Sequence, residues 1–149
     1  MNETGMHARR AEAMATICNH IRPEVPWFSP GEFQQRSQED EWTIVDVRSP
    51  QERGVSIIPG ALSREGFEAQ VDEHAGRQIL VYCTAGCRSG AYVTDLRQKG
   101  LNAFNLRGGV LGWALNGGPF VTADGHPTRR VHVHHHPWNV LPPGYEAVG

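Results

Sequence analysis

A cysteine directly follows a run of strand-favouring residues in the middle of the chain. Cys83 comes after the apolar residues 79–82, and five residues later Arg88 opens a helical pattern. A thiol at the start of a tight loop before a helix meets converging backbone N–H groups and the positive end of the helix dipole. Both favour the thiolate, which is the nucleophilic form of cysteine. The sequence therefore predicts a reactive cysteine rather than a small buried apolar residue.

The loop after Cys83 has residues whose size and charge suit an oxyanion. Small residues allow the loop to curl until successive N–H groups face the sulfur. The guanidinium of Arg88 can bind a planar oxyanion through two N–H groups, and Ser89 is expected to cap the following helix. We expect a substrate to be bound by Thr84, Ala85, Gly86, Cys87, Arg88 and Ser89.

Composition narrows the function classes. The 149 residues match one domain with terminal extensions, and the net charge of −2 gives no general attraction to nucleic acid or an anionic membrane. The sequence has no apolar run long enough to span a membrane, and its first residues lack a secretory apolar core. We therefore expect a cytoplasmic protein. The sequence indicates no oligomeric state.

The other two cysteines have different expected roles. Three cysteines are an odd number, which argues against a disulfide framework. Cys18 is expected to be a core residue of an N-terminal helix. Cys87 is either an ordinary small loop residue or a thiol that attacks a Cys83 persulfide and releases sulfide, and the first interpretation is favoured because a bridge requires close Cα atoms.

The predicted elements place Cys83 at the carboxyl end of a strand in a parallel sheet. Strands are predicted over residues 42–47, 79–82 and 103–106, and helices over 89–99 and 110–115. Their alternation indicates βαβ units, in which reactive groups lie beyond the carboxyl ends of the strands.

Further helices are predicted before and between these elements. Ser29 is expected to cap a short helix with Pro30 at its first position, and another helix is predicted over 67–74. A helix over 6–21 would be amphipathic, with one stripe formed by Ala11, Met14, Ile17, Cys18 and Ile21.

Three segments occur in a recognisable order. They are Asp-Val-Arg-Ser-Pro-Gln-Glu at 46–52, Tyr-Cys-Thr-Ala-Gly-Cys-Arg-Ser at 82–89, and Asn-Leu-Arg-Gly-Gly-Val-Leu-Gly-Trp at 105–113. Together they resemble the signatures of a single rhodanese homology domain, the sulfurtransferase fold. The resemblance implies a three-layer α/β domain over 25–121 with a five-stranded parallel sheet. A helical extension over 1–24 would precede it, and a His- and Pro-rich extension over 122–149 would follow.

The resemblance also implies an activity. Cys83 would take a sulfane sulfur from thiosulfate or a persulfide donor, hold it as a persulfide, and pass it to a thiol or cyanide, as in a thiosulfate:cyanide-type sulfurtransferase. No cofactor is implied. Asp46 and Arg48 are expected to support the loop rather than to react.

Two other functions use the same features. Cysteine phosphatases and arsenate reductases of related architecture have five residues between cysteine and arginine, whereas four separate Cys83 from Arg88. The narrower loop fits one sulfur atom on cysteine better than a phosphoryl group. A second alternative is a non-catalytic module that binds a partner or a metal and retains the loop.

Histidines are concentrated near the C-terminus. His132, His134 and His136 alternate, so an extended strand would place them on one face as candidate ligands for zinc, copper or nickel. The spacing is not that of a zinc finger or an H-E-x-x-H motif. We therefore predict a solvated or packed tail, not a metal site.

Overall fold

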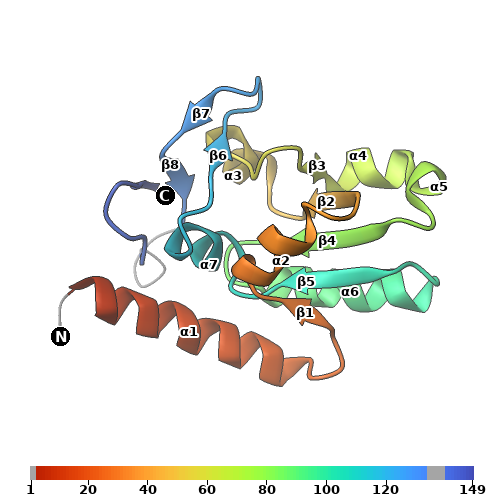
Figure 1. Cartoon of the computed structure of the whole chain (residues 1–149), viewed down its shortest axis with the longest axis horizontal. Coiled ribbons are helices and arrows are strands. Elements are labelled where there is room, and N and C mark those ends of the chain that lie inside the picture. The colour runs from red at the N-terminus through yellow and green to blue at the C-terminus, as the bar shows by residue number, and fades with distance from the viewer. Residues whose placement is uncertain (1–2, 134–139) are drawn as a thin grey trace.

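A five-stranded parallel sheet forms the centre of the chain (Figure 1). The computed structural model describes residues 3–133 and 140–149. Neighbouring strands pair in parallel throughout. In spatial order the strands are β1 (Trp27–Phe28), β5 (Ala103–Leu106), β4 (Gln78–Tyr82), β2 (Trp42–Asp46) and β3 (Leu62–Ser63). This confirms the α/β class and the five-stranded parallel sheet.

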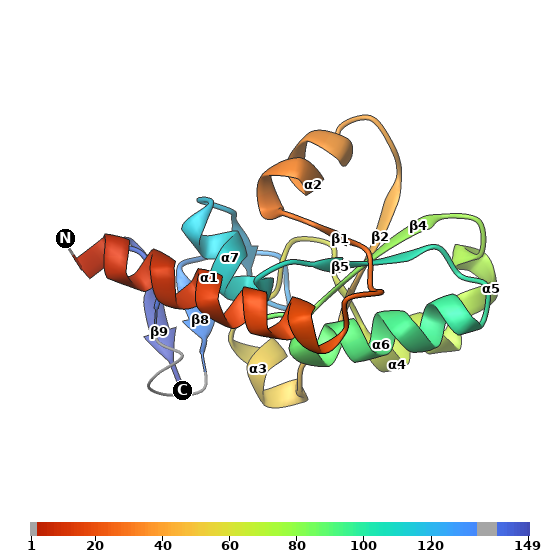
Figure 2. The same ribbon diagram turned by 90° about the horizontal axis from the view of Figure 1, so that it is seen from below.

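Helices cover both faces of this sheet (Figure 2). They are α1 (Glu3–Ile21), α2 (Pro30–Arg36), α3 (Pro50–Val55), α4 (Arg64–Ala69), α5 (Val71–His74), α6 (Cys87–Gln98) and α7 (Gly109–Leu115). Side chains of β4 alternate between two cores, as the twofold repeat of a strand requires. Ile79 and Val81 pack in the core formed with α4 and α6, whereas Leu80 and Tyr82 pack in the core formed with α2 and α7.

Two helices begin with the same local sequence. Ser29 and Ser49 are each followed by proline and, three residues on, by glutamate, and both form a complete capping box. The serine side chain accepts from the N–H of the glutamate, whose carboxylate accepts from the N–H of the serine. The predicted cap at Ser29 is confirmed. The second box holds Glu52, which also contacts the loop that follows Cys83.

Some helical predictions were wrong. The helix predicted over 67–74 divides at Gln70 into α4 and α5. Ser89 does not cap α6, because the helix begins at Cys87 after Gly86, whose φ of 114° is left-handed. In α1 the predicted stripe is buried only in part: Ala11 and Cys18 are buried, whereas Ile17 and Ile21 are 59% and 64% exposed.

The C-terminal extension packs on the domain where the structure describes it. β6 (Phe120–Val121) pairs with β7 (Pro127–Thr128), and β8 (Arg130–His132) pairs with β9 (Glu146–Val148). Apolar residues of the extension join the core of α2 and α7, namely Val131, Val133, Val140 and Leu141. Leu141 also accepts a hydrogen bond at its carbonyl from Nδ1 of His7 in α1, at 3.1 Å.

The histidine expectation is tested only in part. His132 is buried in β8, whereas His134 and His136 lie outside the described residues. Within residues 3–133 and 140–149, three or more His, Cys, Asp or Glu side chains do not gather as they would around a metal ion. In the same ranges, none of the helices has the length and apolarity needed to cross a membrane.

Candidate active site around Cys83

Cys83 lies where β4 ends, at the start of the loop that leads into α6. Its Sγ accepts a hydrogen bond from the N–H of Gly86 at 3.2 Å. The loop carbonyls are bound on the opposite side by the first turn of α7. The N–H of Val110 donates to the Cys83 carbonyl at 3.0 Å, and that of Leu111 donates to the Thr84 carbonyl at 3.2 Å. The backbone of α7 therefore fixes the direction in which the loop curls.

Gly109 permits this close approach between α7 and the loop. A Cβ at this position would lie 2.6 Å from the carbonyl carbon of Thr84 and closer still to the carbonyl oxygen of Cys83. Its φ of 55° is also left-handed, which favours glycine. The Gly-Gly pair at 108–109 thus has a steric role beside Cys83.

A buried polar chain positions the far side of the loop. The Asn105 Nδ2 group donates to the Gly86 carbonyl at 3.0 Å, which leaves Oδ1 to accept from the Ser89 hydroxyl at 2.6 Å. The Ser89 oxygen lies 3.3 Å from Cys83 Sγ. Because a serine hydroxyl has one proton, Ser89 faces the sulfur as an acceptor while it donates to Asn105. Rotation of that proton would turn Ser89 into a donor toward a sulfur anion.

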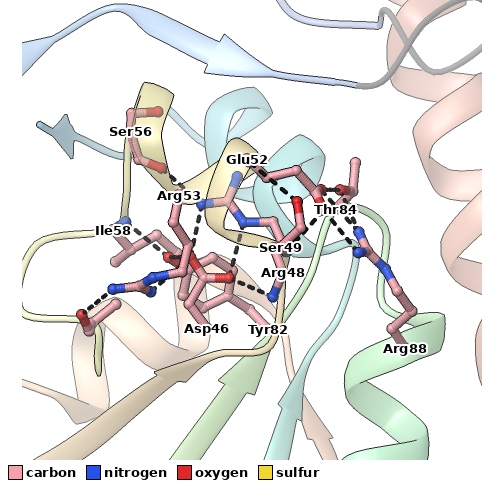
Figure 3. Close-up of polar contacts among 11 residues, drawn as sticks. Asp46, Arg48, Ser49, Glu52, Arg53, Ser56, Ile58, Tyr82, Thr84 and Arg88 are labelled. Carbon is pink, nitrogen blue, oxygen red and sulfur yellow. Dashed lines mark hydrogen bonds and ion pairs between the residues drawn. The ribbon is translucent and has the colours of Figure 1, made fainter. Parts of the chain in front are cut away.

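Glu52 joins the loop to the start of α3 (Figure 3). The Arg88 guanidinium donates to both of its carboxylate oxygens, at 2.9 and 3.0 Å, and the Thr84 hydroxyl donates at 3.0 Å. Burial alone would raise the pKa of the Glu52 carboxyl, but the bonds from Arg88 and the Ser49 N–H outweigh it and hold that pKa well below its usual range. Glu52 in turn raises the pKa of Arg88. The guanidinium expected to meet a substrate therefore contacts a carboxylate.

Asp46 and Arg48 form a buried pair behind the loop (Figure 3). Arg48 Nε and Nη2 donate to the two carboxylate oxygens of Asp46 at 2.9 and 2.8 Å, and Nη2 also donates to the Ser56 carbonyl at 2.8 Å. The Tyr82 hydroxyl donates to Asp46 at 2.9 Å. Burial would lower the pKa of Arg48, but Asp46 reverses this and raises it; burial and Asp46 both raise the pKa of Tyr82. The pair lies among β2, β4 and the end of α3.

The model of the Rhodanese-like domain family matches residues 29–116. The chain belongs to the rhodanese-like family. The recognised resemblance and the single-domain organisation are thereby confirmed, and family membership identifies the chain as a relative of sulfurtransferases.

Curated relatives of the rhodanese-like chain include a sulfurtransferase of Allochromatium vinosum, which is 31% identical over 62% of this chain and 90% of that protein. A tRNA uridine(34) hydroxylase of Chlamydia muridarum is 30% identical over 61% of this chain, which spans only 31% of that larger protein. The similarity to the first relative covers nearly its whole length, whereas the second contains much that this chain lacks.

Solved structures agree on the fold. A thiosulfate sulfurtransferase of Pseudomonas aeruginosa matches with a TM-score of 0.62 and 24% identity, covering 78% of this chain and 23% of that chain. A rhodanese-related protein of Thermoplasma volcanium matches with a TM-score of 0.57 and 25% identity, covering 65% of this chain and 98% of that chain. At the first of these identities the match shows the fold alone.

The rhodanese-like domain has a disulfide that the sequence interpretation did not foresee. Cys18 of α1 is bonded to Cys87, the first residue of α6, with Cα atoms 4.8 Å apart. Cys18 is buried as expected, but neither cysteine is the simple core or loop residue that was predicted. The error arises because 69 residues separate the pair in sequence, and only the docking of α1 beside the loop brings them together.

The sulfur of Cys83 is buried in this disulfide-bonded form. Cys83 is the one free cysteine among the described residues and is only 2% exposed. Of the predicted substrate-binding residues, Thr84, Ala85, Gly86 and Ser89 are also buried, whereas Cys87 and Arg88 are exposed. The loop thus curls around the sulfur of Cys83, but solvent hardly reaches that sulfur.

Sequence reasoning missed several residues of this rhodanese-like site. Glu52, Tyr82 and Asn105 all contact the loop or its supporting pair. Each lies inside one of the three signature segments, which was the available signal. Their partners lie tens of residues away, so the segments indicated that these positions matter but not what they touch.

Proposed function

We propose that this chain is a sulfurtransferase that moves a sulfane sulfur from thiosulfate or a persulfide donor to a thiol or cyanide through a persulfide on Cys83. The observation that supports this most is the hydrogen bond from Gly86 N–H to Cys83 Sγ, in a loop whose carbonyls are bound by α7. Such a loop can stabilise negative charge on sulfur.

The proposed reaction has two steps. The Cys83 thiolate attacks the sulfane sulfur of thiosulfate, the S–S bond of the donor breaks, and sulfite leaves with the bonding pair. The acceptor thiolate or cyanide then attacks the outer sulfur of the Cys83 persulfide, and the Cys83 thiolate is regenerated. Gly86 N–H would hold the anionic sulfur in both steps, and the Ser89 hydroxyl would join it when its proton turns from Asn105 Oδ1 to the sulfur.

Arg88 would contribute charge near the entrance. Its side chain is 44% exposed, and Glu52 keeps the guanidinium fixed at the rim of the loop. An anionic donor would be attracted to this edge by the positive charge of Arg88. A cytoplasmic location is part of the proposal, because the thiol reductants of that compartment would keep Cys83 and its acceptor reduced.

Persulfide formation is the direct test. The protein is reduced, treated with thiosulfate, and measured by intact mass spectrometry and peptide mapping. We expect the mass of one added sulfur atom on Cys83 and its removal by cyanide with release of thiocyanate. Cys83→Ser should form no adduct and lose at least about a thousandfold in turnover.

The same samples separate the alternatives. Hydrolysis of a phosphomonoester that depends on Cys83, without a sulfur adduct, would overturn the proposal in favour of a phosphatase. A reduced, folded protein that acquires no adduct and has no turnover of either kind would overturn it in favour of a binding module. Cys18→Ser serves as the matched control, because it removes a thiol outside the loop.

A further inference from the structure

The Cys18–Cys87 disulfide joins the N-terminal helix to the reactive loop itself. Cys87 follows Gly86, whose N–H binds Cys83 Sγ, and precedes Arg88, which binds Glu52. The bond therefore attaches α1 within one residue of two groups that shape the site. Its breakage or formation would be felt first by the loop around Cys83.

Two terminal parts of the chain enclose this side of the domain. α1 contacts α6 and α7, and β8 of the C-terminal extension contacts α3. Ala85 of the loop is 5% exposed and belongs to the same buried cluster as Ala11 of α1 and Val131 of β8. Figures 1 and 2 both place the N-terminal half of α1 beside the C-terminal segments. We call α1 and β8 the cover; Cys83 lies two residues before Ala85 in the loop that the cover flanks, and it is 2% exposed.

The non-covalent attachment of α1 consists of small buried side chains, the partly buried Met14, and a few polar contacts that include the His7–Leu141 hydrogen bond. Its buried residues are the small Ala11, Ala15 and Cys18, whereas Ile17 and Ile21 face solvent. Small side chains remove little apolar surface from water, so they contribute little to docking. The disulfide is thus a major part of what holds α1 on the loop.

A polar contact adds to this attachment. Arg107 forms a forked ion pair with Glu12 of α1, with both N···O distances 2.7 Å, but the Glu12 side chain is 63% exposed. An ion pair that water can reach stabilises weakly. Without the disulfide, α1 would therefore open far more readily.

We propose that Cys18 and Cys87 form a reversible thiol–disulfide site that controls access to Cys83: the disulfide keeps the cover closed over the sulfur, and reduction lets α1 move away. If the proposed function holds, sulfur transfer proceeds in the reduced form. The change in exposure of the Cys83 thiol between the two forms does not depend on that function.

The redox step balances with a dithiol as the co-reactant. A thiolate of the dithiol attacks the sulfur of Cys87, the exposed member of the pair, and Cys18 leaves as a thiolate. The second thiol of the reductant attacks the mixed disulfide, which releases Cys87 and leaves the reductant as a cyclic disulfide. Two electrons pass from the dithiol to the protein. A small disulfide such as oxidised glutathione runs the reverse reaction by the same exchange.

The test measures the alkylation rate of Cys83 directly. The full chain is oxidised with oxidised glutathione or reduced with dithiothreitol, freed of reagent, and treated with iodoacetamide. Peptide sequencing by mass spectrometry then distinguishes Cys83 from Cys87. We expect alkylation of Cys83 to be at least about tenfold faster in the reduced protein, because opening of α1 no longer requires local unfolding against a covalent bond.

A double variant gives a control without redox reagents. Cys18→Ser with Cys87→Ser should alkylate at Cys83 at the reduced rate under both conditions. Cys18→Ser alone should lose the redox dependence while its circular dichroism spectrum shows a folded chain. Equal Cys83 rates in oxidised and reduced wild-type protein would overturn the proposal, as would failure of oxidised protein to form the Cys18–Cys87 bond.

This readout is independent of sulfur transfer. Redox-dependent alkylation with no persulfide in either form would leave the access control standing and remove the proposed function. If the oxidised and reduced forms acquire the persulfide at equal rates and are alkylated at Cys83 at equal rates, the proposed function stands and the access control is removed.

Discussion

Arg88 and Glu52 form a forked pair that ties the reactive loop to the first turn of α3. The two N···O distances are 2.9 and 3.0 Å, and Thr84 donates to the same carboxylate. Glu52 also closes the capping box with Ser49. One side chain thus stabilises a helix start and fixes the loop beside Cys83, so the two cannot move independently.

Removing the Glu52 charge should destabilise the protein. Glu52→Gln keeps the volume but loses the charged acceptor, and we expect a loss of about 1–2 kcal/mol in the free energy of unfolding at neutral pH. The cost stays moderate because Arg88 is 44% exposed and water can replace its partner. Denaturant unfolding measures the difference. Glu41→Gln is the control, since the Glu41 side chain is 83% exposed and its Arg77 contact is 4.0 Å long.

The same pair predicts a pH dependence. The pKa of Glu52 lies below its ordinary value of 4.5 in the folded chain, so the unfolded chain binds this proton more readily. The stability from Glu52 is therefore full above pH 4.5 and is lost as the pH falls through the depressed value. The difference in unfolding free energy between wild type and Glu52→Gln should shrink on acidification. A constant difference from neutral pH down to acid unfolding would refute this.

Gly109→Ala should damage both stability and the loop. The new Cβ would lie 2.6 Å from Thr84 and at a left-handed φ, so α7 must move away from the loop. We expect a loss of about 2–4 kcal/mol and a large loss of persulfide formation. Gly117→Ala is the matched control, because its φ is 76° but nothing lies within 4 Å of its Cβ. If Gly109→Ala and Gly117→Ala lose the same free energy of unfolding, close packing of Gly109 against the loop does not cause the loss.

The sequence predicted those parts of the fold whose signals are local. The capping residues at Ser29, the strand at 103–106 and the position of Cys83 at a strand end follow from neighbouring residues. The start of α6 did not, because a left-handed Gly86 allows the helix to begin two residues earlier than Ser89 suggests. The exposure of Ile17 and Ile21 in α1 was also not predicted, since a stripe of apolar residues does not show which face of the helix packs on the domain.

The position of Cys83 in the candidate site was predictable from the sequence, but the contacts around it were not. Cys83 and its loop are contiguous in sequence, whereas Glu52 reaches Arg88 across 36 residues and Cys18 reaches Cys87 across 69. Such pairs depend on how α1 and α3 dock, and the pattern of either segment alone contains no information on its partner.

Asn105→Ala should impair the site more than the fold. It would remove one of the two donors to the Gly86 carbonyl, which keeps the N–H of Gly90, and it would remove the acceptor of the buried Ser89 hydroxyl, at a cost of about 1–3 kcal/mol. Ser89 would lose the contact that holds its oxygen beside Cys83 Sγ, so persulfide formation should slow even in protein that is fully folded at the assay temperature. Unfolding and adduct formation are measured on the same sample. Asn102→Ala, on the exposed turn before β5, is the control and should change neither.

Asp46→Asn tests whether the buried pair is structural. Both the Asp46 and Arg48 side chains are 0% exposed, so removing the negative charge leaves a buried guanidinium without its counter-charge. We expect a loss of about 3–5 kcal/mol in the free energy of unfolding. Glu146→Gln, in a pair with Arg130 whose side chains are 58% and 68% exposed, should cost no more than about 0.5 kcal/mol. The two variants are compared by denaturant unfolding with the disulfide intact.

The activity of Asp46→Asn distinguishes support from chemistry. Asp46 lies behind the loop and contacts Arg48 and Tyr82, while Cys83 Sγ is bound by Gly86 and Ser89. Reduced variant protein that is folded at low temperature should therefore still form the Cys83 persulfide, within about tenfold of the wild-type rate. A variant that stays folded but forms no persulfide would show that Asp46 acts on the reaction itself. An equal unfolding loss for Glu146→Gln would contradict the role of burial.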